Sequence, residues 1–462
     1  MRAVPSTKKP NLLFLLGLYV TSCLLFFCFF YFVLEQGKQS FCLYDSDQYL
    51  AIARSLLKGQ GFWEAEHNWY AYRLPGYSLL LGALIRVAGD TIFGVLFLQV
   101  ILLSFLPLTF YFLSKTLFPF HEQVARTVGV IGMVWFSCML YAGFFLTEGI
   151  FTLLFLCMIG FYLRGRSKFS ILLAAGAMVG FLSLIRPVGA GLMILLSLGI
   201  ILEGYNSAFT WGSVFKRMAL FIMSWGAVVL PWLIRNYMMF GAFFFHSLPG
   251  KHFLQYSGAN VYAAAHNLSY LTARQMLFEQ TDKEISLQSE AKGRALNEYE
   301  ECQILEKKAW EILIKHPFYT LKDCCINWGK TLCMLHSTPL VFAHKGWPTY
   351  TEHTTLAEKI MFYLGYGKGP WWLTVLVWYD MMQMFFLWIC VLAAVIARAR
   401  NLLSKEIFWG CFFLCGFFVF LTLSYSCARL RASIEPLILI VGIYSLFQLY
   451  SQPYFYKIRS RQ

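Results

Sequence analysis

Two carboxylates early in the chain, Asp45 and Asp47, are its first candidates for chemistry. They flank Ser46 directly before residues 49–56, where apolar side chains recur at helical spacing, and Lys58-Gly59 is typical of a helix end. The pattern predicts an amphipathic helix that lies along a membrane interface. Asp and Ser before a helix also cap its free backbone N–H groups, so capping is the competing explanation.

Other ionisable residues stand at the ends of long apolar runs. Glu148 begins one run, and the arginines in such positions are Arg186, Arg235, Arg429 and Arg431. Charges at the edge of the hydrocarbon are costly unless they are paired or hydrated, which makes them functional candidates. Snorkelling of the long side chain to the interface is the alternative for each arginine taken singly.

Carboxylates beside guanidinium groups suit a reaction in which an anionic lipid head group leaves and a hydroxyl attacks. One carboxylate would act as the general base, and arginine would stabilise the departing phosphate.

A divalent metal is an alternative that the residues leave open, because Asp-x-Asp is a familiar oxygen-ligand arrangement for hard cations. Residues two apart do not face each other on a helix, so both aspartates would bind one ion only if the segment is extended. The candidate ligands are Asp45, Asp47, Glu66, His67 and His266. Residues such as Glu66, His67 and His266 are ordinarily solvated on a protein surface.

The composition predicts an integral membrane protein. Hydrophobic residues make up 58% of the 462 residues and charged residues only 13%, too few to cover a water-facing surface. The formal net charge is +14, but Lys and Arg fall mainly in short segments between apolar runs. That pattern indicates topology and membrane lipids as neighbours rather than a nucleic acid partner.

About ten apolar runs approach the length that spans the roughly 30 Å hydrocarbon core as a helix. They are residues 12–34, 92–113, 127–145, 147–163, 170–185, 188–202, 219–234, 372–397, 407–425 and 434–450. The pair around Arg186 is read as a hairpin, because one long helix would carry a charge at its centre.

Basic residues set the expected orientation. Arg2, Lys8 and Lys9 precede the first run, and Lys457 and Arg459 follow the last, so both termini are expected in the cytoplasm. Glu148 and the four arginines then share the external face with residues 35–90 and the long segment 236–370. Its polar middle, residues 272–315, predicts helices at or above the membrane surface.

Three regions are expected. Residues 1–235 form an amino-terminal transmembrane core with a catalytic first loop, residues 236–370 an external region, and residues 371–462 the carboxyl-terminal transmembrane helices.

Several short motifs in order give the chain a family resemblance. They are Asp45-x-x-x-Tyr49, Gly61-Phe62, Arg73-x-Pro75-Gly76-Tyr77, Thr147-Glu148, Arg186-Pro187, Pro231-Trp232-x-x-Arg235-Asn236, Arg429-x-Arg431 and Glu435-Pro436. With them the chain, from about residue 12 to 450, resembles the polyprenyl-phosphate-sugar-dependent glycosyltransferases of the GT-C superfamily. The most similar group is glycosyltransferase family 39, which includes bacterial aminoarabinose transferases and protein mannosyltransferases.

The resemblance implies an all-α GT-C-like membrane bundle that transfers one sugar, with inversion, from a polyprenyl-phosphate donor to a lipid, glycan or protein acceptor. It implies a bacterial inner membrane location with the site facing the periplasm. Asp45 matches the catalytic base, Asp47 is the reserve candidate, and Glu148 matches a second acidic position. The implied donor-phosphate residues are Arg73, Arg186, Arg235, Arg429 and Arg431. No soluble domain follows the last run, which argues against the large oligosaccharyltransferases.

Rival functions remain. A transporter or flippase of lipid-linked sugars would place its site near the bilayer midplane on broken helices, whereas these ionisable residues gather at one edge. A ligase or polymerase of surface polysaccharide would transfer a whole glycan, and the sequence does not separate it from a single-sugar transferase.

Overall fold

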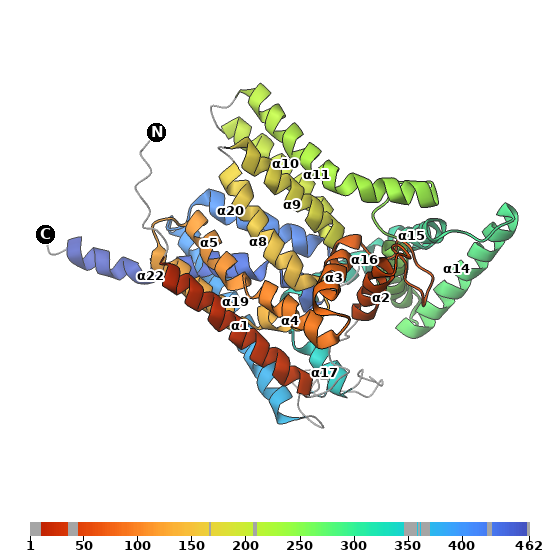
Figure 1. Ribbon diagram of the computed structural model, residues 1–462, viewed down its shortest axis with the longest axis horizontal. Helices are drawn as coiled ribbons and strands as arrows, with labels where there is room; N and C mark the ends of the chain where they lie inside the picture. Colours follow the sequence, from red (N-terminus) through yellow and green to blue (C-terminus); the bar gives the residue numbers. More distant parts are fainter. Residues whose placement is uncertain are drawn as a thin grey trace.

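The computed structural model describes residues 11–35, 45–165, 168–206, 210–345, 370–422 and 427–459, together with residues 358 and 361. These residues form a bundle of α-helices, and one isolated antiparallel bridge joins Glu64 to Trp69 (Figure 1). The expected all-α class is confirmed.

Six helical segments in the described part of the chain are long and apolar enough to cross a bilayer. They are α1 (Leu12–Glu35), the joined α4 (Ile92–Leu103) and α5 (Leu106–Leu117), α8 (Thr147–Gly165), α10 (Val188–Asn206), α11 (Trp211–Phe240) and α19 (Trp371–Ala399). Helices also occupy most of the described residues in the remaining expected ranges. They contain the pair α6 (Glu122–Val134) and α7 (Phe136–Ala142), then α9 (Phe169–Ile185), α20 (Lys405–Phe420) and α22 (Glu435–Arg459). The chain is a multi-pass integral membrane protein.

Two expected spans are not single straight helices. The range 92–113 breaks at Ser104 and Phe105, and α6 and α7 meet at Trp135 with a bend of 49°. Gln383 of α19 stabilises that bend: its side-chain carbonyl accepts from Phe136 N–H (2.7 Å), and its amide donates to the Val134 carbonyl (2.8 Å). Gln383 thus replaces hydrogen bonds that the helix gives up, which hydropathy does not reveal.

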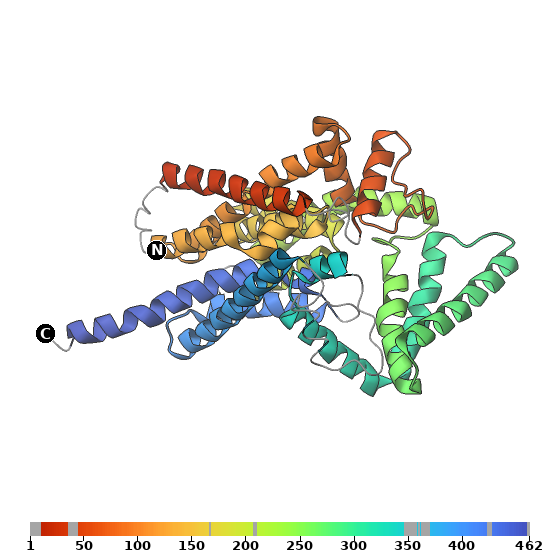
Figure 2. The same ribbon diagram turned by 90° about the horizontal axis from the view of Figure 1, so that it is seen from below.

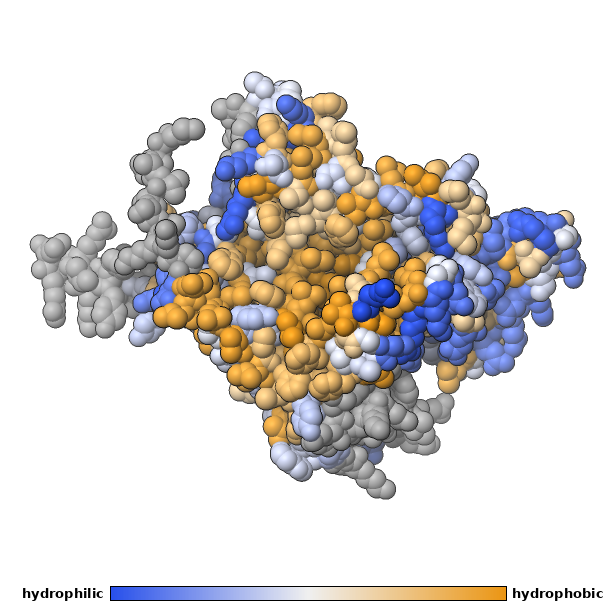
Figure 3. Space-filling view, viewed as in Figure 1, coloured by the Kyte–Doolittle hydropathy of each residue, from blue (hydrophilic) through white to orange (hydrophobic). Residues whose placement is uncertain are grey.

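The ends of the bundle differ in character. Figures 1 and 2 show that α1 begins and α22 ends at one end, with α14 (Tyr270–Lys292), α15 (Glu298–Lys315) and α16 (Pro317–Cys333) at the other. Figure 3 shows hydrophobic side chains over the middle of the molecule and hydrophilic ones at the α14 end. This distribution is the one expected when the bundle crosses a bilayer and α14 to α16 lie outside it.

The first loop region contains α2 (Ser46–Leu57) and α3 (Pro75–Ala88), which pack against each other. Gly76 permits a close approach between α3 and α9, because a Cβ at this position would lie 2.8 Å from the Leu184 carbonyl oxygen. The absence of a side chain at Gly76 therefore brings the segment before α3, which carries Arg73, against the end of α9, where Arg186 follows.

The polar middle of the long segment after α11 is helical, as expected, and consists of α14 and α15 joined by a turn at residues 293–297. Before them come α12 (Leu248–His252), a π-helical segment η2 (Phe253–Gly258) and α13 (Ala259–His266), and after them α16 and α17 (Thr338–Lys345). Leu254, Leu277 and Ala309 belong to a small core of this segment, which is separate from the main core of the bundle. The region around residues 347–355 lies outside the described residues.

Candidate active site

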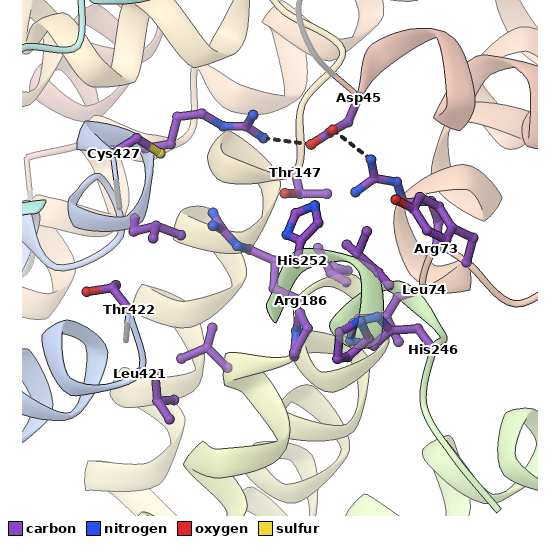
Figure 4. Close-up of a pocket in the computed structure, with 18 of the residues that line it drawn as sticks. Asp45, Arg73, Leu74, Thr147, Arg186, His246, His252, Leu421, Thr422 and Cys427 are labelled. Atoms are coloured by element: carbon purple, nitrogen blue, oxygen red, sulfur yellow. Dashed lines mark hydrogen bonds and ion pairs between the residues drawn. The ribbon is translucent and has the colours of Figure 1, made fainter. Parts of the chain in front are cut away.

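A cavity of about 470 Å³ brings together segments that lie far apart in the sequence (Figure 4). It lies between the start of α2, the segment before α3, the α9–α10 turn, α12 with η2, and the segment before α22. Its charged or titratable lining residues are Asp45, Tyr49, Tyr72, Arg73, Arg186, His246, His252, Tyr256, Cys427 and Arg429.

Asp45 occupies the N-cap position of α2, but its side chain makes no capping hydrogen bond. Instead, Oδ1 accepts from Arg73 Nη2 at 2.6 Å and Oδ2 accepts from Arg429 Nη2 at 3.3 Å. Figure 4 draws both contacts as dashed lines. Capping is therefore the wrong explanation for this carboxylate.

The charge state of Asp45 follows from this environment. Burial raises the pKa of the carboxyl, but the guanidinium groups of Arg73 and Arg429 outweigh burial, so the pKa lies below its usual value. Asp45 is consequently ionised at neutral pH, while 27% of its side chain remains accessible.

Arg73 is held in place by more than its ion pair. Its Nε donates to Gln48 Oε1 at 2.7 Å, and its guanidinium carbon lies 5.5 Å from the Tyr49 ring centre and 5.2 Å from that of Tyr72. Aromatic faces attract a guanidinium group, so the position of Arg73 is restricted on three sides.

Glu148 lies directly behind the cavity and is fully buried. Its Oε1 accepts from Arg429 Nε at 2.7 Å and lies 3.2 Å from Arg186 Nη1. Glu148 does not line the cavity. The carboxylate is thus placed to orient two arginines that do line it.

The cavity carries more positive than negative charge. In the part of the chain that the structure describes, Arg73, Arg186 and Arg429 pair with two carboxylates, those of Asp45 and Glu148. Within the described residues, Arg186 Nη1 and Glu148 Oε2 are buried atoms with no hydrogen bond. Arg186 Nη1 is nevertheless ion-paired with Glu148 Oε1 at 3.2 Å. Three guanidinium groups against two carboxylates leave one uncompensated positive charge, which indicates an anionic ligand at this cavity.

Two arginines expected at the donor phosphate do not line the cavity. Arg235 lies within α11, which continues beyond the expected end at residue 234; it donates to Phe62 O at 3.3 Å and lies 4.8 Å from the Trp232 ring centre. Arg235 therefore fastens the first loop to α11.

Arg431 is directed into the protein, and only 2% of its side chain is exposed. Its Nε donates to Glu435 Oε1 (2.6 Å), and its Nη1 donates to the carbonyls of Thr331 and Leu332 at the end of α16. Glu435 also contacts His336 Nε2 at 2.8 Å. This network joins the external helices to the short helix α21 (Ala428–Arg431) that carries Arg429.

The expected metal ligands do not form one site. Asp47 is exposed in the first turn of α2, and both oxygens of Asp45 contact arginines. Among the described residues, one group of three or more candidate ligands lies within 4.8 Å, namely Glu64, Glu66 and His67. Glu64 there already accepts hydrogen bonds from the backbone N–H groups of Glu66 and His67. No three of the five expected ligands come together, so the donor set does not fit a metal at Asp45.

Two histidines that the sequence analysis did not single out, His246 and His252, also line the cavity. Figure 4 shows both rings at the cavity. Burial and then Arg73 lower the pKa of His252 to about 4, although Asp45 acts in the opposite direction. Burial and the same arginine lower the pKa of His246 to about 3. Both imidazoles are therefore neutral at physiological pH.

Comparison with solved structures supplies the fold type. Over 96% of its residues the chain superimposes on 51% of the archaeal oligosaccharyltransferase AglB from Archaeoglobus fulgidus, with a TM-score of 0.52 and 11% identity. The chain has a GT-C fold. At this identity the likeness establishes the fold alone, and this chain spans about half the length of AglB.

A weaker likeness links the chain to ArnT from Cupriavidus metallidurans. The TM-score is 0.40 and the identity 14%, over 95% of this chain and 77% of ArnT. That value is too low to support an argument. No family model and no curated protein matches the sequence.

Proposed function

We propose that this chain transfers a single sugar, with inversion, from a polyprenyl-phosphate donor to an acceptor hydroxyl at the external face of the membrane. The excess of arginine at the cavity supports this proposal most directly. The GT-C fold agrees with it, and the AglB structure that shares the fold holds a dolichol-phosphate.

Arg186 and Arg429 are the groups that bind the donor phosphate. Their side chains are 12% and 11% exposed, and both line the cavity while Glu148 holds them from behind. Charge develops on the phosphate oxygen as the glycosidic bond breaks, and prearranged guanidinium groups stabilise that charge.

Asp45 serves as the general base. The acceptor oxygen forms a bond to the anomeric carbon while the bond from that carbon to the phosphate oxygen breaks. The acceptor proton moves to the Asp45 carboxylate, and the electron pair leaves with the polyprenyl phosphate. Because the pKa of Asp45 is low, the proton transfers late, when the attacking oxygen has become acidic.

The position of the charges favours an enzyme over a transporter. Asp45 and three arginines gather in one cavity beside α12 and η2, in segments outside the helices that qualify as spans, and Glu148 stands behind the cavity in the first turn of α8. Transport sites usually lie near the bilayer midplane between repeats.

Asp45→Asn tests the proposal, because this change removes the base and preserves size. We expect the variant to insert and fold normally but to lose the mass shift that the wild-type chain adds to cellular glycolipids or glycoproteins. Asp90→Asn, which breaks an exposed ion pair with Arg54, is the control with unchanged transfer. Full transfer by Asp45→Asn would overturn the proposal, and a mass shift larger than one sugar would indicate glycan ligation instead.

A further inference from the structure

A second cavity of about 350 Å³ adjoins the first on the side away from the bundle. One face of α14 and one face of α15 form its walls, and Trp69, Tyr72 and Lys251 close its inner end. Tyr72 lines both cavities. The helix α12 also contributes to both cavities, because His252 lines the first cavity and its neighbour Lys251 lines the second.

The inner end of the second cavity is a rigid aromatic wall. The rings of Trp69 and Tyr72 stack with their centres 3.7 Å apart, and Lys251 Nζ lies 5.0 Å from the centre of the Trp69 ring. Glu298 of α15 fastens this wall by accepting hydrogen bonds from the backbone N–H groups of Tyr70 and Ala71. The carboxylate of Glu298 is thus already engaged.

The positively charged side chains of this cavity lie apart from the negatively charged ones. Lys251 and Arg274 both line the cavity, and Arg274 stands eight residues, about 12 Å, from Asp282 along α14. Burial and then Arg274 lower the pKa of Lys251. Burial and then Glu298 and Asp282 raise the pKa of Glu301, so the anions lie close to one another as well.

None of the side chains of Lys251, Arg274, Asp282 and Glu301 forms an ion pair within the part of the chain that the structure describes. If the cavity were simply an imperfect contact between α14 and α15, pairing of opposite charges would be the stable arrangement. Asp282 is exposed, but Lys251, Arg274 and Glu301 are partly buried. Partly buried charges without counter-ions are unfavourable, and a ligand that supplies the opposite charges stabilises them.

We propose that the second cavity binds the acceptor, a sugar-containing molecule whose anionic group contacts Lys251 and Arg274 beside Tyr72. Its hydroxyl groups donate hydrogen bonds to Glu301 and Asp282. Its sugar ring lies against the edge of the aromatic wall, because Tyr72 and His67 stack on Trp69 and cover the faces of its ring. This role rests on the proposed sugar transfer. Because Tyr72 lines both cavities, an acceptor held here extends one hydroxyl past this side chain toward Asp45.

Binding of simple sugar phosphates to the full chain in lipid nanodiscs tests the site. The ligands are the 6-phosphates of glucose, galactose, mannose and glucosamine, with methyl glucoside and inorganic phosphate as partial ligands, measured by calorimetry. We expect at least one hexose phosphate to bind about tenfold or more tightly than either partial ligand. Absence of binding by all four hexose phosphates, or equal affinity for inorganic phosphate, would overturn the proposal.

Charge-matched variants locate the site. Lys251→Gln with Arg274→Gln is expected to weaken hexose phosphate binding about tenfold or more, whereas Lys283→Gln with Lys307→Gln, both exposed on the same two helices, leaves it unchanged. Glu301→Gln is expected to weaken the binding of hexose phosphate but not the binding of inorganic phosphate. It provides a second measurement if the double variant does not fold. Equal losses in both double variants would indicate a general charge effect and would contradict the site.

Asp45→Asn separates this inference from the proposed function. It is expected to abolish transfer while hexose phosphate affinity stays at the wild-type value. If transfer is lost but Lys251→Gln with Arg274→Gln binds normally, the second cavity is not the site and the proposed function stands. If Asp45→Asn transfers sugar normally, the proposed function fails and the acceptor role fails with it.

Discussion

Asp45 and Arg429 are separated by 384 positions in the sequence, yet Asp45 Oδ2 lies 3.3 Å from Arg429 Nη2. The same guanidinium group donates through Nε to Glu148 at 2.7 Å. One arginine near the end of the chain thus connects the carboxylate at the start of α2 with the carboxylate at the start of α8. The cavity between these elements depends on this connection.

Arg429→Lys and Arg431→Lys are expected to differ although the residues are two apart. Arg429 lines the cavity, and lysine cannot reproduce its contacts with two carboxylates and a phosphate, so we expect the rate of transfer to fall about 10- to 100-fold. Arg431 donates to two carbonyls and Glu435 away from the cavity. Replacement of Arg431 is expected to lower the melting temperature and to leave the donor KM near its wild-type value. Steady-state kinetics with a polyprenyl-phosphate sugar and thermal unfolding together measure both effects.

Glu148→Gln is expected to reduce transfer by about tenfold or more, because Arg186 and Arg429 lose the charge that orients them. Glu122→Gln is the matched control: Glu122 also contacts two cations, Lys115 and Arg126, but it lies away from the cavity. We expect Glu122→Gln to transfer at the wild-type rate. Equal rates for both variants would contradict the orienting role of Glu148.

Gly76→Ala is expected to destabilise the protein by about 1–3 kcal/mol and to reduce transfer, because the new methyl group would meet the Leu184 backbone. Gly82→Ala on the same helix is the control, since its nearest neighbour, the Ala53 oxygen, lies 3.8 Å from the added Cβ. Thermal unfolding in nanodiscs and the transfer assay provide the comparison. A normal melting temperature for Gly76→Ala would show that α3 and α9 are not in tight contact.

Stability is expected to fall as the pH drops from 6.5 toward 4. The pKa of His252 is about 4 in the folded protein and 6.5 ordinarily, so the unfolded chain binds more protons in this window and gains stability relative to the folded chain. His246, with a pKa of about 3, acts in the same direction. The double variant His246→Gln with His252→Gln is expected to show a smaller change in melting temperature between pH 7.5 and pH 5 than the wild type. An unchanged pH dependence in the double variant would mean that these imidazoles are solvated rather than buried.

Asp45 affects the stability of the protein at a lower pH than the two histidines do. Its pKa is depressed in the folded chain, so its contribution to stability is present above its usual pKa and is lost as the pH falls through the depressed value. We therefore expect no inflection in the rate of transfer between pH 5 and pH 8 from the base itself. An inflection there that disappears in His252→Gln would assign the titration to His252.

That the chain is helical and crosses the bilayer several times could be predicted from the sequence. Long apolar runs must form helices in lipid, because a helix satisfies its own backbone hydrogen bonds there. Arg186-Pro187 marked the turn between α9 and α10, since a charge at mid-membrane is costly. The bend at Trp135 could not be predicted, because Gln383 of a distant helix stabilises it.

The candidate site likewise has features that the sequence predicted and features that only the structure revealed. The sequence by itself determined that Asp45, Glu148 and several arginines stand at helix ends, because amino-acid type and hydropathy are local properties. Only the tertiary structure decided that Asp45 contacts arginines rather than capping α2, that Arg429 lines the cavity while Arg431 is buried, and that His252 reaches it. The direction of each side chain depends on which distant helix packs against it, and that packing has no local signature in the sequence.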